Sequence, residues 1–170
     1  MFMTARKKSV RRKIGGILKV DLRDGTHCYG HITVDPCIIF YDGRFDVDVD
    51  VSDISKLPEL FNLSVSNYAI KDGVWPIIGF SALTEKQLLK PYRYMQDDFT
   101  GKLSIYHPDF ADTNYQRQAT FEECVGLECA AVWDPEHVFD RLIDHYEGRA
   151  NKWVSQLAIN EKRYREFLLK

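Results

Sequence analysis

The sequence lacks any long apolar run. Its longest stretch without a charged residue is the twelve residues from Gly73 to Thr84, interrupted by Pro76, whereas a membrane-spanning helix needs about 20 apolar residues. The first apolar stretch, Ile14 to Leu18, has five residues and two glycines, too few for the core of a secretory signal. These absences disfavour a membrane or exported protein, and we expect the chain to act in the cytoplasm.

Catalytic and cofactor motifs are also missing. The sequence contains no G-x-S-x-G elbow, glycine-rich phosphate loop, dinucleotide fingerprint or H-E-x-x-H helix, which are the local patterns that position nucleophiles, phosphates or metals. We therefore interpret the chain as a binding protein rather than an enzyme, and we expect no cofactor.

Cysteine is scarce, and its spacing forms no C-x-x-C pair. Metal sites built from cysteine usually need such close pairs, and a disulfide framework needs an oxidising compartment. We therefore predict reduced, buried thiols and no bound metal. The four cysteines are Cys28, Cys37, Cys124 and Cys129.

Charge is unevenly distributed along the chain. The formal net charge is −2, but six of the 23 basic residues lie between Arg6 and Lys13, and no acidic residue precedes Asp21. The other 17 basic residues face 25 acidic ones, a net charge of −8. We expect residues 1–13 to form a basic, flexible arm and residues 14–170 to form a single acidic domain that attracts basic proteins. The arm leaves one alternative open, a nucleic-acid-binding module.

The N-terminal half has the alternation typical of β-hairpins. Polar and apolar residues alternate from Leu18 to Leu22, and Asp24-Gly25 provides a turn before a second run from Cys28 to Val34. An apolar strand from Cys37 to Tyr41 follows. The next run alternates strictly and is predicted to be a strand, with one apolar face, Phe45, Val47, Val49 and Val51, and one acidic face, Asp46, Asp48 and Asp50.

The middle of the chain continues this pattern less regularly. Runs from Leu63 to Ile70 and from Val74 to Phe80 flank a turn and predict a third hairpin. Thr84 to Gln87 has the spacing of a capping box, which predicts one or two helical turns. The other expected elements are a helical or turn segment around residues 53–60, a strand over residues 102–106 and an exposed loop over residues 109–118.

Helices are predicted mainly in the C-terminal third. Asp134 and Pro135 suit the N-cap and first position of a helix that ends before Gly148. A capping box at Thr120 to Glu123 and a strand over residues 127–132 should precede it. A second helix should run over residues 151–169, with four side chains facing the core: Trp153, Leu157, Tyr164 and Leu168. The fold class is therefore α+β, an antiparallel sheet that could be curled or barrel-like, covered by late helices.

An acidic cluster, Asp46, Asp48, Asp50 and Asp53, only superficially resembles a calcium loop. Val51 stands where such a loop needs glycine, and Leu57 stands where it needs glutamate. Alternate residues of a strand are also about 6.6 Å apart along the backbone. We therefore interpret the cluster as a solvated face or as a contact stripe for a basic partner.

Two histidines share one face of the first predicted hairpin. His27 and His31 are four residues apart, and strand side chains alternate between faces. We interpret them as exposed strand residues. An uncharacterised hydrolase built around this pair is a second alternative, and a housekeeping interaction domain is a third.

Three stretches carry a family resemblance. The first runs from the basic arm through Gly16 to Leu22, Asp24-Gly25, Tyr29-Gly30 and Ile38 to Tyr41. The second is residues 68–79, with Trp75 and Gly79, and the third is residues 127–142, with Ala131 to Val138. Together they are similar to the bacterial immunity protein 26 family, whose members occur beside polymorphic secreted toxins. Residues 92–118 and the final helix resemble nothing in this pattern, which makes them candidates for a partner-specific surface.

The resemblance implies an immunity protein that binds and neutralises a cognate toxin domain, as in contact-dependent growth inhibition. We expect it to occlude the active or substrate-binding surface of the toxin, which could be a basic nuclease. Nucleic acid and membrane are not expected ligands. The candidate toxin-binding residues are acidic or aromatic: Asp46, Asp48, Asp50, Tyr92, Tyr94, Asp97 and Asp98.

Overall fold

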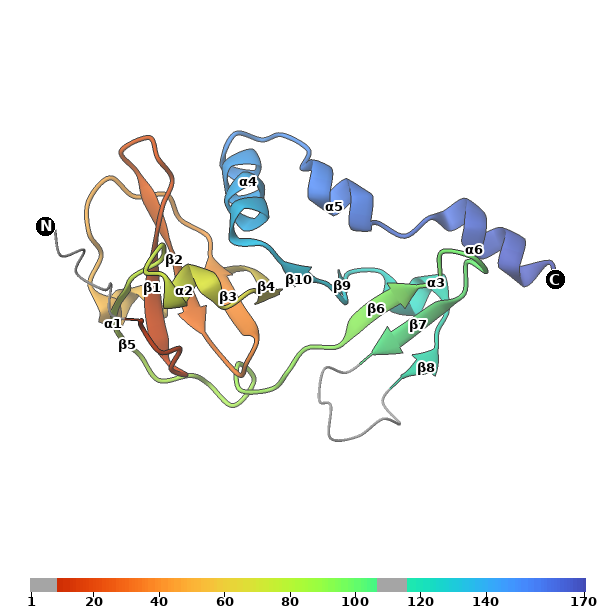
Figure 1. Cartoon of the computed structure of the whole chain (residues 1–170), viewed down its shortest axis with the longest axis horizontal. Coiled ribbons are helices and arrows are strands. Elements are labelled where there is room, and N and C mark those ends of the chain that lie inside the picture. The colour runs from red at the N-terminus through yellow and green to blue at the C-terminus, as the bar shows by residue number, and fades with distance from the viewer. Residues whose placement is uncertain (1–8, 107–115) are drawn as a thin grey trace, which may run out of the picture. The chain divides into compact units, whose positions relative to one another are not determined.

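The protein has an α+β fold, as expected (Figure 1). The computed structural model describes residues 9–106 and 116–170. Two mixed, mostly antiparallel sheets are present, and the helices are concentrated toward the C-terminal end. The chain divides into two compact units, Met1–Leu88 with Trp133–Phe139, and Leu89–Val132 with Asp140–Lys170. Among the described strands, neither sheet is curled or closed into a barrel. A single domain that begins after residue 13 stays a prediction.

The first unit is built on a six-stranded sheet. Its first hairpin is confirmed: Lys19 pairs with Tyr29, and Thr26 N donates to Asp24 Oδ1 at 2.9 Å within a turn where Gly25 has φ +84°. Glycine tolerates this left-handed conformation without a steric penalty. The strands, in sheet order, are β10 (Val132–Trp133), β4 (Glu59–Val65), β3 (Cys37–Tyr41), β2 (His27–Ile32), β1 (Gly16–Asp21) and β5 (Ile77–Phe80).

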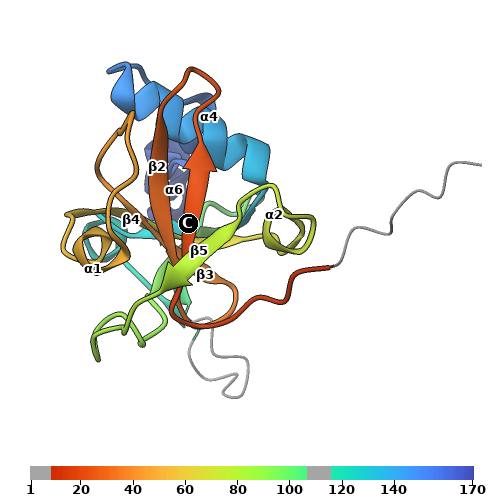
Figure 2. The same cartoon turned by 90° about the vertical axis from the view of Figure 1, so that its left-hand side faces the viewer.

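Both faces of this sheet are covered. On one face, Tyr29 and Tyr41 pack with Ile54 of α1 (Val51–Ile54). On the other, the ring of Phe40 contacts Phe61 and Trp75, which follows α2 (Tyr68–Lys71). Figure 2 shows α1 and α2 on opposite sides of the sheet. Because both faces are covered, the central strands β2 and β3 are buried along their whole length.

Two strand predictions in this unit are wrong. Residues 45–50 form only an isolated bridge, Phe45 to His27 of β2, because β1 and β3 already flank β2 in the sheet, and Val51 begins α1. The expected third hairpin over residues 63–80 is replaced by β4, α2 and β5, and β5 pairs with β1. Thr84 and Gln87 do make both capping-box hydrogen bonds, at 3.0 and 3.2 Å, but around a single turn.

The second unit contains a four-stranded sheet. Its order is β8 (Arg117–Gln118), β7 (Leu103–Tyr106), β6 (Arg93–Gln96) and β9 (Glu128–Cys129), with β6 and β9 parallel. The strand expected over residues 102–106 is therefore confirmed. The single strand expected over residues 127–132 is instead divided between β9 and β10, which belong to different sheets. Of the loop expected over residues 109–118, residues 109–115 lie outside the described residues.

The predicted helix starts are confirmed. In α3 (Phe121–Cys124), Thr120 and Glu123 form a complete capping box. At α4 (Pro135–Tyr146), Glu136 N donates to Asp134 Oδ1 at 2.8 Å. The helix expected over residues 151–169 is broken into α5 (Lys152–Leu157) and α6 (Glu161–Leu168), because Asn160 starts a new cap by accepting from Arg163 N at 3.0 Å.

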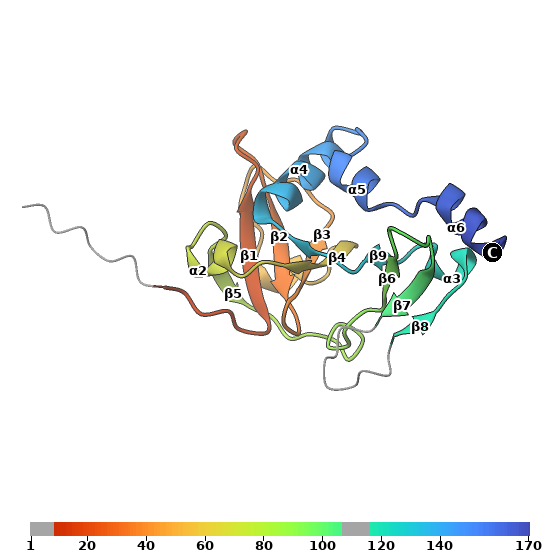
Figure 3. The ribbon, with the colours of Figure 1, turned by 45° about the vertical axis from the view of Figure 1, so that its right-hand side comes forward.

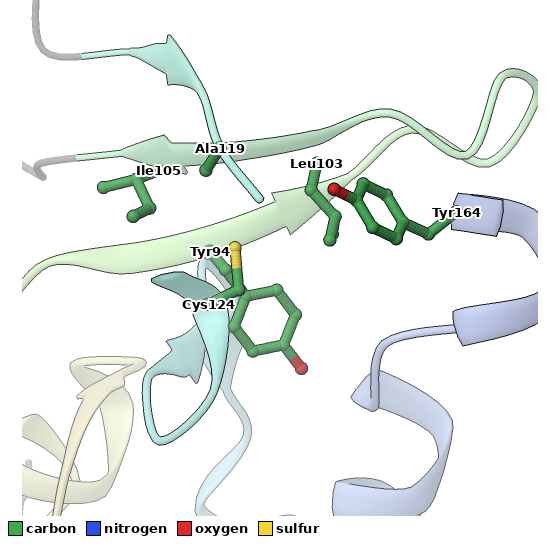
Figure 4. Packing of buried hydrophobic residues seen from close by; sticks show 6 residues of the cluster. All are labelled: Tyr94, Leu103, Ile105, Ala119, Cys124 and Tyr164. Atoms are coloured by element: carbon green, nitrogen blue, oxygen red, sulfur yellow. The ribbon is translucent and has the colours of Figure 1, made fainter. Parts of the chain in front are cut away.

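The core of the second unit joins α3 and α6 to its sheet. Figure 4 shows the buried side chains, Tyr94, Leu103, Ile105, Ala119, Cys124 and Tyr164. Tyr164 faces this core as expected, whereas Leu168 is 61 % exposed, so its predicted burial is wrong. The four cysteines are not joined in disulfides, and three of them, Cys28, Cys37 and Cys124, are buried.

Candidate functional site

The acidic segment, Asp46 to Asp50, forms an exposed loop of the first unit. The predicted alternation of buried apolar and exposed acidic side chains holds for Val49, which packs against the core cluster that contains Tyr29 and Ile54. It does not hold for Val47, which is 68 % exposed. Val49 N also donates to the hydroxyl of Tyr29 at 2.9 Å. The loop is therefore anchored to the sheet without becoming one of its strands.

Asp48 is fixed by a charged partner. Lys19 Nζ donates to Asp48 Oδ1 at 2.5 Å, and His27 Nε2 lies 3.5 Å from the same oxygen. The hydrogen bond from Lys19 and the charge of its ammonium group lower the pKa of Asp48. Two further carboxylates of the segment, Asp46 and Asp50, lie exposed beside it. Because one lysine faces three carboxylates, the segment presents a net negative charge to solvent.

The two hairpin histidines are buried, so the prediction of exposed histidines is wrong. His31 Nε2 lies 3.0 Å from the carbonyl oxygen of Ser81, and His31 Nδ1 lies 2.8 Å from the hydroxyl of Tyr41. A carbonyl can only accept, so Nε2 carries the proton and Nδ1 accepts from Tyr41. Burial lowers the pKa of both His27 and His31. With both ring nitrogens of His31 engaged, the pair supports the fold rather than a hydrolytic site.

The basic arm contributes a structural side chain. Arg12 donates through Nη2 to the carbonyl oxygen of Cys37 at 2.8 Å, and its Nε lies 3.4 Å from Asp35 Oδ1. The Arg12 side chain is only 8 % exposed. Arg12 is therefore not available to a phosphate backbone, whereas its neighbours Arg11 and Lys13 are exposed.

The aromatic candidates of the second unit divide into one exposed and one buried residue. Tyr92 is 51 % exposed, whereas Tyr94 is 7 % exposed and donates its hydroxyl to the carbonyl oxygen of Leu157. Burial raises the pKa of Tyr94 to about 12. Tyr94 therefore belongs to the core, and Tyr92 is the aromatic side chain of this pair that a partner can reach.

The turn between β6 and β7 holds the remaining acidic candidates. Asp97 Oδ1 accepts a hydrogen bond from Thr100 N within the same turn. The side chain of Asp98 is 90 % exposed, and its Oδ1 lies 3.6 Å from Arg163 Nη1. Between them and Gly101 stands Phe99, which is 95 % exposed. Phe99 is not among the residues predicted for the site, although aspartate before it and Gly101 after it are residue types typical of a turn.

Residues 9–106 and 116–170, the part of the chain that the structure describes, contain no group of three or more histidine, cysteine, aspartate or glutamate side chains that could hold a metal ion. None of the helices there has both the length and the hydropathy of a membrane span.

A family model described as immunity protein 26 matches residues 13–103, more than half of the 170-residue chain. The chain belongs to the immunity protein 26 family. The matched residues cover β1 to β6, the acidic segment and the β6–β7 turn. The family pattern therefore includes residues 92–103, which the sequence resemblance had left out. No curated protein and no solved structure gives a significant match.

Proposed function

We propose that this immunity protein 26 member binds and neutralises a cognate bacterial toxin in the cytoplasm. The family match over residues 13–103 carries this proposal. An antidote to a lethal protein must leave almost none of it free, which requires a dissociation constant of about 1 nM or lower. An interface of roughly 1,600 Å² is the usual size for such a complex.

The acidic segment is the part of the first unit that we assign to toxin binding. Asp46 and Asp50 are exposed, and Lys19 fixes Asp48 between them. Clustered carboxylates accelerate the approach of a basic partner and can then pair with the cationic side chains of its substrate site. The proposed mechanism is therefore occlusion: the segment covers a basic surface that the toxin, for example a nuclease, uses for its substrate.

The test begins with identification of the toxin. The tagged chain is used to capture partners from its host under toxin-producing conditions, and each candidate toxin domain is then co-expressed with the chain. Protection of growth against one such domain, together with a stable purified complex, supports the proposal. A chain that protects against none of the captured domains, although they are toxic and expressed, contradicts it.

Charge reversal then tests the acidic segment. Asp46→Lys combined with Asp50→Lys should weaken toxin binding about 10- to 100-fold, mainly through slower association that depends on salt. Asp72→Lys combined with Glu85→Lys is the matched control, because both residues are exposed carboxylates of the same unit. If surface plasmon resonance gives the same affinity for the two double variants, the assignment of the acidic segment to the toxin interface is wrong.

A further inference from the structure

Phe99 occupies an unusual position for an aromatic residue. It is 95 % exposed, the highest value among the large apolar side chains of the described residues. A phenylalanine in contact with water forgoes the free energy that its burial would contribute. Isolated exposed apolar residues are common on protein surfaces, so the case for a function rests on how this side chain is held.

The turn that presents Phe99 is fixed by its own hydrogen bonds. Asp97 Oδ1 accepts from Phe99 N at 3.0 Å, from Thr100 N at 2.6 Å and from Thr100 Oγ1 at 2.9 Å. Asp97 N donates to the carbonyl oxygen of Lys102 at 2.9 Å, and Gly101 N donates to the carbonyl oxygen of Asp97 at 2.8 Å. These bonds define the β6–β7 tip, Asp97 to Gly101, as an ordered turn.

Contacts with α6 support the base of the tip. Gln96 Nε2 donates to the carbonyl oxygen of Asn160 at 3.0 Å, and Asn160 N donates back to Gln96 Oε1 at 2.7 Å. Arg163 Nη1 donates to the carbonyl oxygen of Asp98 at 2.9 Å. Gly101, with φ +81°, lies so close to α6 that a Cβ there would be 2.3 Å from the carbonyl oxygen of Arg163. Figure 3 shows the β6–β7 hairpin beside α6.

Such an arrangement lowers the entropic cost of binding through Phe99. The backbone on both sides of the ring is already ordered, so a partner does not have to order it. Interface hot spots are typically rigid anchors that fill an apolar pocket. The Asp97 carboxylate is engaged within the turn, whereas the side chain of Asp98, the residue before Phe99, is 90 % exposed and has Arg163 Nη1 3.6 Å from its Oδ1. A complementary site would be an apolar pocket with a cationic side chain at its rim.

We propose that the β6–β7 tip is an anchor for the toxin, with Phe99 inserted into an apolar pocket whose rim carries a basic side chain that pairs with Asp98. This inference rests on the proposed function and names a second contact for it. The net charge of −8 on residues 14–170 favours a basic protein over an anionic lipid surface as the partner of the tip, because like charges repel.

The test uses the full chain and the toxin domain identified by growth protection. Phe99→Ala should raise the dissociation constant about 30-fold or more, the size of a hot-spot effect, with faster dissociation as the main change. Phe99→Tyr should retain most of the affinity, because its ring fills the same pocket. Leu169→Ala is the matched control, since Leu169 is an 88 % exposed apolar residue of the same unit. Thermal unfolding of each variant checks that the fold is intact.

The dissociation constants of these variants distinguish the anchor from its alternatives. Loss of affinity for Phe99→Ala but not for Leu169→Ala supports the anchor. Equal affinity of Phe99→Ala and the wild-type chain overturns the anchor while leaving the proposed function in place. If sedimentation shows instead that Phe99→Ala abolishes self-association and leaves toxin binding unchanged, the tip is a contact between copies of this chain and the inference is wrong. Failure of the wild-type chain to bind or protect contradicts the proposed function itself.

Discussion

His31 shows how one polar residue can be accommodated at the centre of a sheet. It is fully buried in β2, and its two ring nitrogens are engaged by the Tyr41 hydroxyl and the Ser81 carbonyl oxygen. A buried polar group without such partners would destabilise the fold, whereas a satisfied one helps to specify a single packing. The neutral ring is the form that this site accepts.

The stability of the protein should therefore fall as the pH drops below about 6.5, the ordinary pKa of histidine. Because the pKa of His31 is lowered in the folded state, the unfolded chain binds a proton that the folded chain does not bind. The part of the free energy of unfolding that depends on His31 is constant above this pH. Below it, the free energy of unfolding decreases by at most about 1.4 kcal/mol per pH unit for one proton. Denaturant unfolding between pH 5 and pH 8 measures it.

His31→Gln should be less stable than the wild-type chain at pH 7.5 but should lose less stability on acidification. Glutamine keeps a donor and an acceptor but cannot take up the proton. The pKa of His27 is lowered by burial as well, so the variant carrying both His27→Gln and His31→Gln should have the flattest profile. A single variant that retains the full pH dependence of the wild-type chain would show that His31 does not titrate as described.

Among the helices, the start of α5 depends on one buried side chain with two roles. Asn151 is 8 % exposed, and its Oδ1 accepts from Trp153 N at 3.1 Å and from Val154 N at 3.0 Å. Its Nδ2 donates to Asp144 Oδ2 at 2.9 Å, which is the largest of the causes that lower the pKa of Asp144. The cap therefore also connects α5 to the end of α4.

Asn151→Asp should destabilise the protein by about 2 kcal/mol, although aspartate is as good an N-cap as asparagine. The substitution removes the donor to Asp144 and places a second carboxylate against it. Asn160→Asp is the matched control at the start of α6, where the cap accepts from Arg163 N. It should be neutral or slightly stabilising, because an acidic residue suits a helix N-terminus. Equal losses for the two variants in urea unfolding would contradict the role of Asp144.

Local signals were sufficient for some of these elements and insufficient for others. The Asp24-Gly25 turn and the caps at Thr120 and Asp134 depend on residues close in sequence, and all three were predictable. The segment at Asp46 to Asp50 alternates like a strand, but pairing requires a free sheet edge, and sequence alone does not reveal which edges are occupied. The same holds for the site: Tyr94 is buried and Phe99 is exposed. Tertiary packing determines this difference, and the local sequence does not show it.

On the scale of the whole molecule, the family assignment and the distribution of charge favour the same kind of partner. The immunity protein 26 match spans residues 13–103, and the chain beyond its basic N-terminal residues carries a net charge of −8. An acidic body attracts a basic partner over about 8 Å at physiological ionic strength, the Debye length. Attraction alone gives fast but weak association, so tight binding also needs a desolvated anchor. The acidic segment and Phe99 are proposed for these two roles.

The most direct test of the central claim is a titration of toxin activity with the purified chain. We expect inhibition to be stoichiometric, with activity falling to the background at one chain per toxin domain and a dissociation constant of about 1 nM or lower. The variant carrying Asp46→Lys and Asp50→Lys should need a clear excess to reach the same inhibition. If the toxin that the chain protects against keeps its full activity at saturating chain concentration, neutralisation by direct binding is contradicted.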